Sequence, residues 1–249
     1  MTITNQDVLD AITPNDEQKK LLYVIAGYIV GILILWNVPY LKMIIYPFKL
    51  VTVSFHEFGH AFAGVITGAK IHSITIEPDE GGLTQMTGGN PCCTIPAGYL
   101  GSSLIGALMI FCGFNTIASK VCTVVVGVAL LATMWWARNW LARVIAVLFI
   151  GLLAFLWWLQ GGVGLRYFVA FMGTMSVLYS LYETVDHLIV NKRNESDAVV
   201  YAKYTGCPSR VCGFTWFIVS LVFMAAAIIA GIAAFKHTND TASAPATGN

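Results

Sequence analysis

The sequence predicts an all-α protein that crosses a membrane about seven times, or six, with one small β-hairpin on the cytosolic side. Two observations support this fold class. Apolar residues make up 57% of the 249 residues and charged residues only 11%, with a mean hydropathy of +0.72. A soluble domain is about half apolar and a quarter charged, so this chain lacks the polar surface that water requires on all sides. The apolar residues also gather into runs that are long enough to cross a bilayer as helices.

Seven runs of roughly 18 residues or more form the candidate spans. They cover residues 21–38, 41–67, 95–114, 121–136, 140–159, 165–190 and 214–235. The stretch between the fourth and fifth runs is short, and a kink there would join them and reduce the number of spans to six. Together the runs form a single transmembrane domain at residues 21–237.

Polar segments flank this domain and indicate its orientation. Residues 1–20 hold four acids, unlike the basic start of a cleavable signal peptide, so the first span is expected to remain in the protein. The small polar tail at 238–249 is expected to be disordered. A cytosolic N-terminus places nine of the 14 Lys and Arg residues on the cytosolic side, as the positive-inside rule favours. Seven spans then leave the C-terminus outside.

The second span holds three ionisable side chains close together, and such groups are expensive in a membrane and usually functional. His56, Glu57 and His60 form a His-Glu-x-x-His pattern. Positions i and i+4 lie on one face of a helix, so both imidazoles can bind one metal ion, and zinc accepts such ligands. Glu57 can then take a proton from metal-bound water. The alternative is a buried hydrogen-bond cluster between helices, or a proton path.

A catalytic zinc needs a third protein ligand, and few candidates lie within the membrane layer. The sixth span ends with Glu183, Asp186 and His187, which share one helical face. Asp186 lies at a depth compatible with that of His60 if the helices are tilted. We therefore expect Asp186 to be the third ligand, with Glu183 as the second choice and His187 as the third. The alternative is an acidic helix end that faces the cytosolic headgroups.

Residues 70–87 predict a β-hairpin at the cytosolic mouth of this site. Residues 71–76 are β-branched and partly alternating, residues 78–82 have turn chemistry, and residues 83–87 can return. Ile74, Thr75 and Ile76 would form an edge that pairs with an unwound substrate, since a helix must open before its amide can be attacked. A loop without a role in substrate binding is an equal alternative.

The run Phe55-His56-Glu57-Phe58-Gly59-His60-Ala61 resembles the signature of the site-2 protease family of intramembrane zinc peptidases. Within that family the chain is most similar to a peptidase-like branch found in fungi, plants and bacteria. Three further motifs extend the likeness to about residues 50–212: Gly81-Gly82-Leu83-Thr84, Pro96-Ala97-Gly98-Tyr99-Leu100-Gly101 and, after the acidic helix end, Asn194-Glu195-Ser196-Asp197-Ala198. The resemblance implies one Zn²⁺ per chain, held by His56, His60 and a carboxylate, with Glu57 as general base. Better-known members place the third ligand in a Leu-Asp-Gly motif, which this sequence lacks.

These residues predict a zinc-dependent endopeptidase that hydrolyses peptide bonds of membrane-anchored proteins or peptides within the lipid bilayer. One alternative is a catalytically inactive membrane protein that binds transmembrane clients. Another is an ion-coupled transporter, although the sequence shows no inverted repeat or paired broken helices. The net charge of +1 and the absence of a basic tail argue against a nucleic-acid partner. We expect an integral, multi-pass protein, in an endomembrane if the source is eukaryotic.

Overall fold

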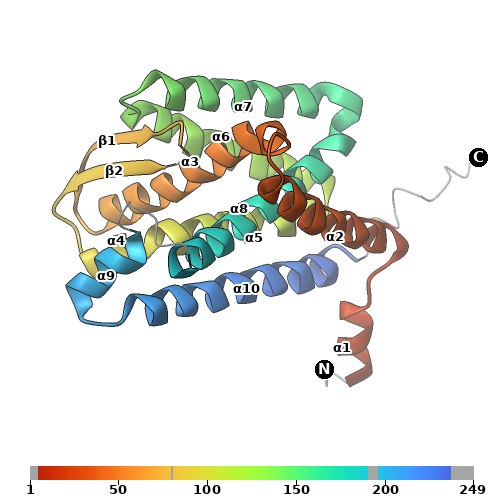
Figure 1. The fold of residues 1–249 in the computed structure, drawn as a ribbon. Coiled ribbons are helices and arrows are strands. Elements are labelled where there is room, and N and C mark those ends of the chain that lie inside the picture. Colours follow the sequence, from red (N-terminus) through yellow and green to blue (C-terminus); the bar gives the residue numbers. More distant parts are fainter. Residues whose placement is uncertain (1–4, 80, 190–195, 237–249) are drawn as a thin grey trace, which may run out of the picture.

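The seven apolar runs each form one helix in the structure, a computed structural model that describes residues 5–79, 81–189 and 196–236 (Figure 1). In chain order these helices are α2 (Asp16–Asn37), α3 (Lys42–Ile66), α5 (Ala97–Gly113), α6 (Thr116–Trp136), α7 (Trp140–Trp158), α8 (Val163–Ile189) and α10 (Ser209–Ala234). Shorter helical segments are α1 (Asn5–Ile12), α4 (Pro91–Thr94), the 3₁₀ turn Leu159–Gly162 and α9 (Asp197–Thr205). The predicted fold class is confirmed; the tail at 238–249 lies outside the described residues.

Four of the helices, α2, α6, α7 and α10, are long and apolar enough to cross a membrane, and α5 is a shorter apolar helix. The protein is therefore an integral membrane protein. Capping residues determine where two of these helices begin. Asn15 accepts a hydrogen bond from the backbone N–H of Gln18 at the start of α2, and Asn115 does the same for Ile117 and Ala118 at the start of α6.

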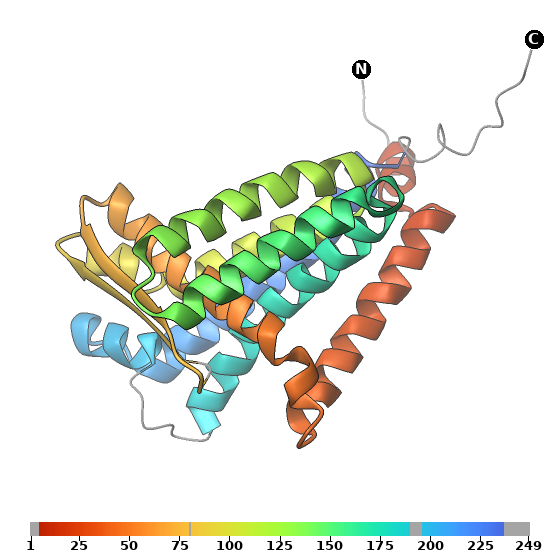
Figure 2. The ribbon, with the colours of Figure 1, turned by 90° about the horizontal axis from the view of Figure 1, so that it is seen from above.

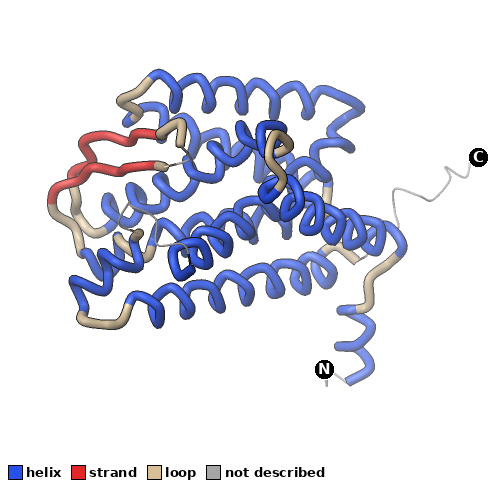
Figure 3. The backbone as a smooth tube through the Cα atoms, viewed as in Figure 1, coloured by secondary structure: helices blue, strands red, loops and turns tan. Residues whose placement is uncertain are grey.

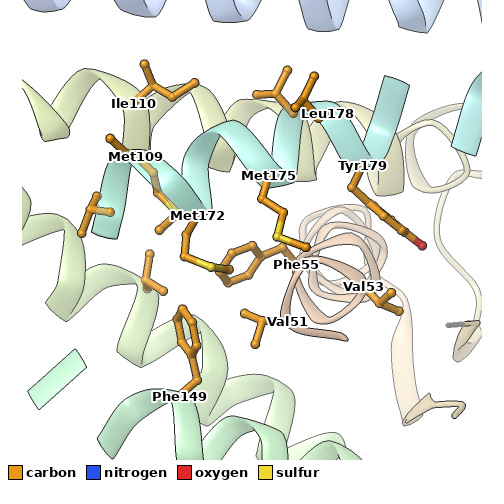
Figure 4. Packing of buried hydrophobic residues seen from close by; sticks show 14 of the residues in the cluster. Val51, Val53, Phe55, Met109, Ile110, Phe149, Met172, Met175, Leu178 and Tyr179 are labelled. Carbon is orange, nitrogen blue, oxygen red and sulfur yellow. The ribbon is translucent and has the colours of Figure 1, made fainter. Parts of the chain in front are cut away.

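Helix α3 lies in the interior of the bundle. Every residue from Lys49 to Glu57 is buried, so the helix is enclosed on all its faces over more than two turns. Figure 4 shows Phe55 beside Met172 and Met175 of α8, while Phe149 of α7 approaches from the opposite side. The neighbouring helices therefore shield the polar residues of α3 from lipid, which removes much of the cost of placing them in a membrane.

Small residues allow α5 to approach its neighbours closely. A Cβ at Gly59 of α3 would collide with the backbone carbonyl of Ala97, and Gly106 of α5 faces Gly173 of α8 with equally little space. Such close contacts are typical of helix packing in membranes. Hydroxyl pairs join α5 to two further helices: Ser102 to Ser180 of α8 at 2.8 Å, and Ser103 to Ser220 of α10 at 2.7 Å. The start of α5 therefore lies against α3 at Gly59 and is hydrogen-bonded to α8 and α10.

Strands β1 (Lys70–Ile76) and β2 (Gly82–Thr87) form the predicted antiparallel hairpin, with Ile74 opposite Thr84. The hairpin, red in Figure 3, lies at one end of the bundle, and α4 and α9 lie at the same end (Figure 1). The connection between α6 and α7 covers the outer edge of β1. There Arg138 donates its backbone N–H to the carbonyl of Ile74 at 2.9 Å, and the Asn139 side chain donates to that of Ile76 at 2.5 Å. No strand of the described residues lies beside the outer edge of β2.

The two ends of the described chain lie together, at the opposite end of the bundle from the hairpin (Figure 2). The Asn15 side chain donates to the carbonyl of Lys236 at 3.0 Å, and that of Gln18 donates to Ile232 at 3.0 Å. Seven crossings would place these ends on opposite sides of a membrane; the side on which each end lies stays a prediction. Figures 1 and 2 show that α2 and α3 follow each other along the bundle from one end to the other.

Candidate metal centre

The three residues of the His-Glu-x-x-His pattern in α3 converge at the end of the bundle that carries the hairpin. His56, Glu57 and His60 are all buried, with exposed fractions of 8%, 4% and 9%. The Nε2 atoms of the two histidines are 3.1 Å apart, as their spacing of one helical turn allows. Nitrogen and carboxylate oxygen atoms of the three side chains all lie within 4.8 Å of one another. The structure thus brings together the residues of the His-Glu-x-x-His pattern.

The ring of His60 is oriented by the backbone of α4. Its Nδ1 lies 2.7 Å from the carbonyl oxygen of Thr94. Because a carbonyl can only accept, Nδ1 carries a proton, and the lone pair of the neutral ring is on Nε2, which faces His56. Histidines that bind metals are commonly held by such a second hydrogen bond. The Nδ1 of His56 has no hydrogen-bond partner among the described residues, and the Tyr99 ring packs edge-on against His56 at 4.8 Å between centroids.

A fourth residue, Asp197, reaches the two histidines from α9. Its Oδ2 lies 3.0 Å from Nε2 of His56 and 3.1 Å from Nε2 of His60. Ser196 is the N-cap of α9 and accepts a hydrogen bond from the Val199 N–H, so Asp197 occupies the first helical position. Burial acts to raise the pKa of the Asp197 carboxyl, but the charge that His60 carries when its ring is protonated, together with the adjacent imidazole of His56, holds the pKa below its usual range.

The side chains of His56, His60 and Asp197 fit a zinc ion. Oδ2 of Asp197 is buried and makes no hydrogen bond of acceptable geometry, although both imidazoles are close to it. An ion bound tetrahedrally at about 2.0–2.1 Å separates its ligand atoms by about 3.3 Å. The observed separations of 3.0 to 3.1 Å are only slightly shorter. Two imidazoles and one carboxylate are also a ligand set of catalytic zinc sites that keep one position open.

Two glycines pack directly against the site. A Cβ at Gly98, in the first turn of α5, would collide with Nε2 of both His56 and His60. A Cβ at Gly82, the first residue of β2, would collide with the carboxyl group of Glu57. Both glycines belong to motifs that carry the resemblance of the sequence to the site-2 protease family. The absence of a side chain at each position leaves room for the imidazoles and the carboxylate.

The acids expected to complete the site belong to α8, whereas Asp197 belongs to α9. Helix α8 continues to Ile189, but the side chains of Glu183, Asp186 and His187 are not among those described, so their assignment stays a prediction. Asp197 was missed because the search for a third ligand was confined to the membrane spans. The signal was present: Asp197 follows a residue suited to cap a helix, within a motif already matched to the family.

Comparison with known proteins assigns the family. The profile described as Peptidase M50B-like matches residues 25–227, which includes α3, the hairpin, α5 and α9. No curated protein and no solved structure matches the chain in the other two comparisons. The match covers most of the 249 residues and every element that contributes to the site. The chain therefore belongs to the Peptidase M50B-like family, within the site-2 protease family of intramembrane metallopeptidases.

Proposed function

We propose that this protein is a zinc-dependent intramembrane endopeptidase that cleaves membrane-anchored peptides or proteins. One observation carries the proposal: Nε2 of His56, Nε2 of His60 and Oδ2 of Asp197 converge on one point beside the carboxylate of Glu57. A buried hydrogen-bond cluster would satisfy its own polar atoms, whereas Oδ2 of Asp197 is left without a hydrogen bond. The arrangement favours a metal centre over such a cluster.

His56, His60 and Asp197 would hold the ion, and Asp197 replaces Asp186 as our choice of third ligand. Zinc bound there would polarise the scissile carbonyl and lower the pKa of water to about 7. Glu57 accepts a proton from the attacking water and delivers it to the amide nitrogen as the carbon–nitrogen bond breaks. Burial of Glu57 keeps bulk water away from this transfer. The carbonyl of Thr94 keeps His60 in the tautomer that can bind metal.

The hairpin offers a place for an extended substrate, on β2 rather than on β1. The expected edge at Ile74, Thr75 and Ile76 is covered by the α6–α7 connection. Glu77 donates to the carbonyl of Gly81 across the turn at 2.7 Å. Hydrogen-bonded and non-hydrogen-bonded pairs alternate along an antiparallel ladder, and Glu77 and Gly81 are a hydrogen-bonded pair. The backbone N–H and C=O groups of Gly82 and Thr84 therefore point away from β1. A substrate strand paired there would run past Glu57.

The test combines metal analysis with cleavage. Purified protein is compared with His56→Ala, Asp197→Ala, Asp186→Ala and Glu57→Gln for zinc content and for hydrolysis of a library of membrane-anchored peptides. We expect about one zinc in the wild type, in Asp186→Ala and in Glu57→Gln, and a loss of zinc in the other two. Cleavage should disappear with Glu57→Gln. A folded wild type that neither binds zinc nor cleaves would favour a non-catalytic protein that binds transmembrane clients.

A further inference from the structure

The hairpin makes a direct contact with Glu57 that the mechanism above does not use. The hydroxyl of Thr84, in β2, lies 2.5 Å from Oε2 of Glu57 and 3.1 Å from the backbone carbonyl of the same residue. A hydroxyl has one proton to donate, and the shorter contact assigns it to the carboxylate. Hydrogen bonds to a charged acceptor are stronger than neutral ones.

The contact with Thr84 is the one hydrogen bond that the Glu57 carboxylate receives within the described part of the chain. Both oxygens belong to a side chain that is 4% exposed, so water has little access to replace the hydroxyl. Glutamate has three rotatable side-chain bonds, and the helix backbone alone does not choose among its rotamers. Thr84 holds one oxygen and leaves the other to exchange protons.

The sequence of β2 is suited to this contact. Residues i and i+2 of a strand point to the same face, so Gly82 and Thr84 both face α3. Gly82 has no side chain and lets the strand lie on the carboxyl group, where a Cβ would collide. Thr84 then supplies the donor on a β-branched side chain with few rotamers. The spacing of two residues between Gly82 and Thr84 therefore lets β2 lie close to Glu57 and also donate a hydrogen bond to it.

We infer that Thr84 is a positioning residue that fixes the carboxylate of Glu57 and couples β2 to the general base. The contact itself is independent of the activity; its catalytic consequence rests on the proposed function. The backbone of Thr84 belongs to the outer edge of β2, where an extended substrate would pair. One residue then touches the substrate strand with its backbone and Glu57 with its side chain, so binding of a substrate would align the base.

The contact is tested without reference to activity. Thermal unfolding is measured for the wild type, Thr84→Val, Glu57→Ala and the double variant, with the zinc content of each recorded. Thr87→Val is the matched control, because its hydroxyl contacts His72 at 2.7 Å, away from the site. We expect the midpoint temperature of the Thr84→Val/Glu57→Ala double variant to be no lower than that of the less stable single variant. In a second double variant, Thr87→Val with Glu57→Ala, the two decreases in stability should add. Additive effects of Thr84→Val and Glu57→Ala would overturn the inference.

The catalytic consequence is tested on the same variants. Thr84→Val should lower kcat by about tenfold or more, as the loss of a hydrogen bond to a charged group predicts, with KM and zinc content unchanged. Thr84→Ser restores the hydroxyl and should recover most of the rate, and Thr87→Val should keep it. An unchanged kcat in Thr84→Val would refute the positioning role. If the wild type cleaves nothing while Thr84 and Glu57 remain coupled, the contact stands and the proposed function fails.

Discussion

The substitution Gly98→Ala tests whether the ligand atoms lie where the structure places them. The added Cβ would lie 2.5 Å from Nε2 and 2.6 Å from Cε1 of His56, and would also collide with Nε2 of His60. Ordinary contacts between such atoms are about 3.5 Å, so the rings or the helix would move by about 1 Å. Metal sites tolerate deviations of about 0.2 Å in their bond lengths. We therefore expect zinc affinity to fall by about 100-fold or more.

Competition with a chromophoric zinc chelator measures this loss in detergent-purified protein. Gly127→Ala is the matched control, since nothing lies within 4 Å of a Cβ at that position in α6. It should bind zinc as the wild type does, and both variants should keep their helical circular dichroism. If Gly98→Ala binds zinc with the affinity of the wild type, the start of α5 does not pack against the imidazoles, and the derived site is wrong.

Three further predictions concern the third ligand, the packing of the bundle and its orientation. Asp197→Asn should weaken zinc binding by about tenfold or more, because a neutral amide replaces a charged ligand, as chelator competition would show. Ser103→Ala should lower the free energy of unfolding by about 0.6 kcal/mol, the typical contribution of a hydrogen bond between membrane helices. In the double variant, Ser220→Ala should lower it little further, as thermal unfolding would show. Impermeant thiol reagents should label Cys92 from the side opposite to tags at both termini, because the hairpin end and the two chain ends are at opposite ends of the bundle.

Much of this fold follows from local patterns in the sequence. Each apolar run forms one helix because a bilayer requires every backbone group to be paired within its own segment. The hairpin was predictable from β-branched residues around a glycine-rich turn. His56, Glu57 and His60 meet because one helix carries them, and their geometry depends on no distant contact.

What the sequence left open depends on the path of the chain in space. Asp197 lies far along the chain from His60, on a helix that is too short and too polar to register as a span. The packing of α9 against α10 and α4 brings its carboxylate to the site. The sequence also did not predict that the two chain ends lie together. Hydropathy identifies apolar runs but does not show that α2 and α3 follow each other along the bundle.

The dependence of the site on α9 leads to a final prediction. No residue of α9 itself is buried, and its Tyr201 ring packs edge-on against Trp216 of α10 at 5.6 Å. Aromatic pairs of this kind contribute about 0.5–1.5 kcal/mol, which corresponds to about a 2- to 10-fold change in an equilibrium. Tyr201→Ala should loosen α9 and weaken zinc binding by that factor, because Asp197 is then less often in place.

Tyr201→Phe keeps the ring and should keep the zinc affinity, which makes it the matched control. Thermal unfolding of the bundle should be nearly the same in both variants, because α9 contributes little buried surface to the core. A loss of zinc without a loss of bundle stability would mean that the metal site is completed by a separately movable element. Equal zinc affinity in Tyr201→Ala would mean that Asp197 is held by its own contacts alone, so that the docking of α9 through Trp216 plays no part in metal binding.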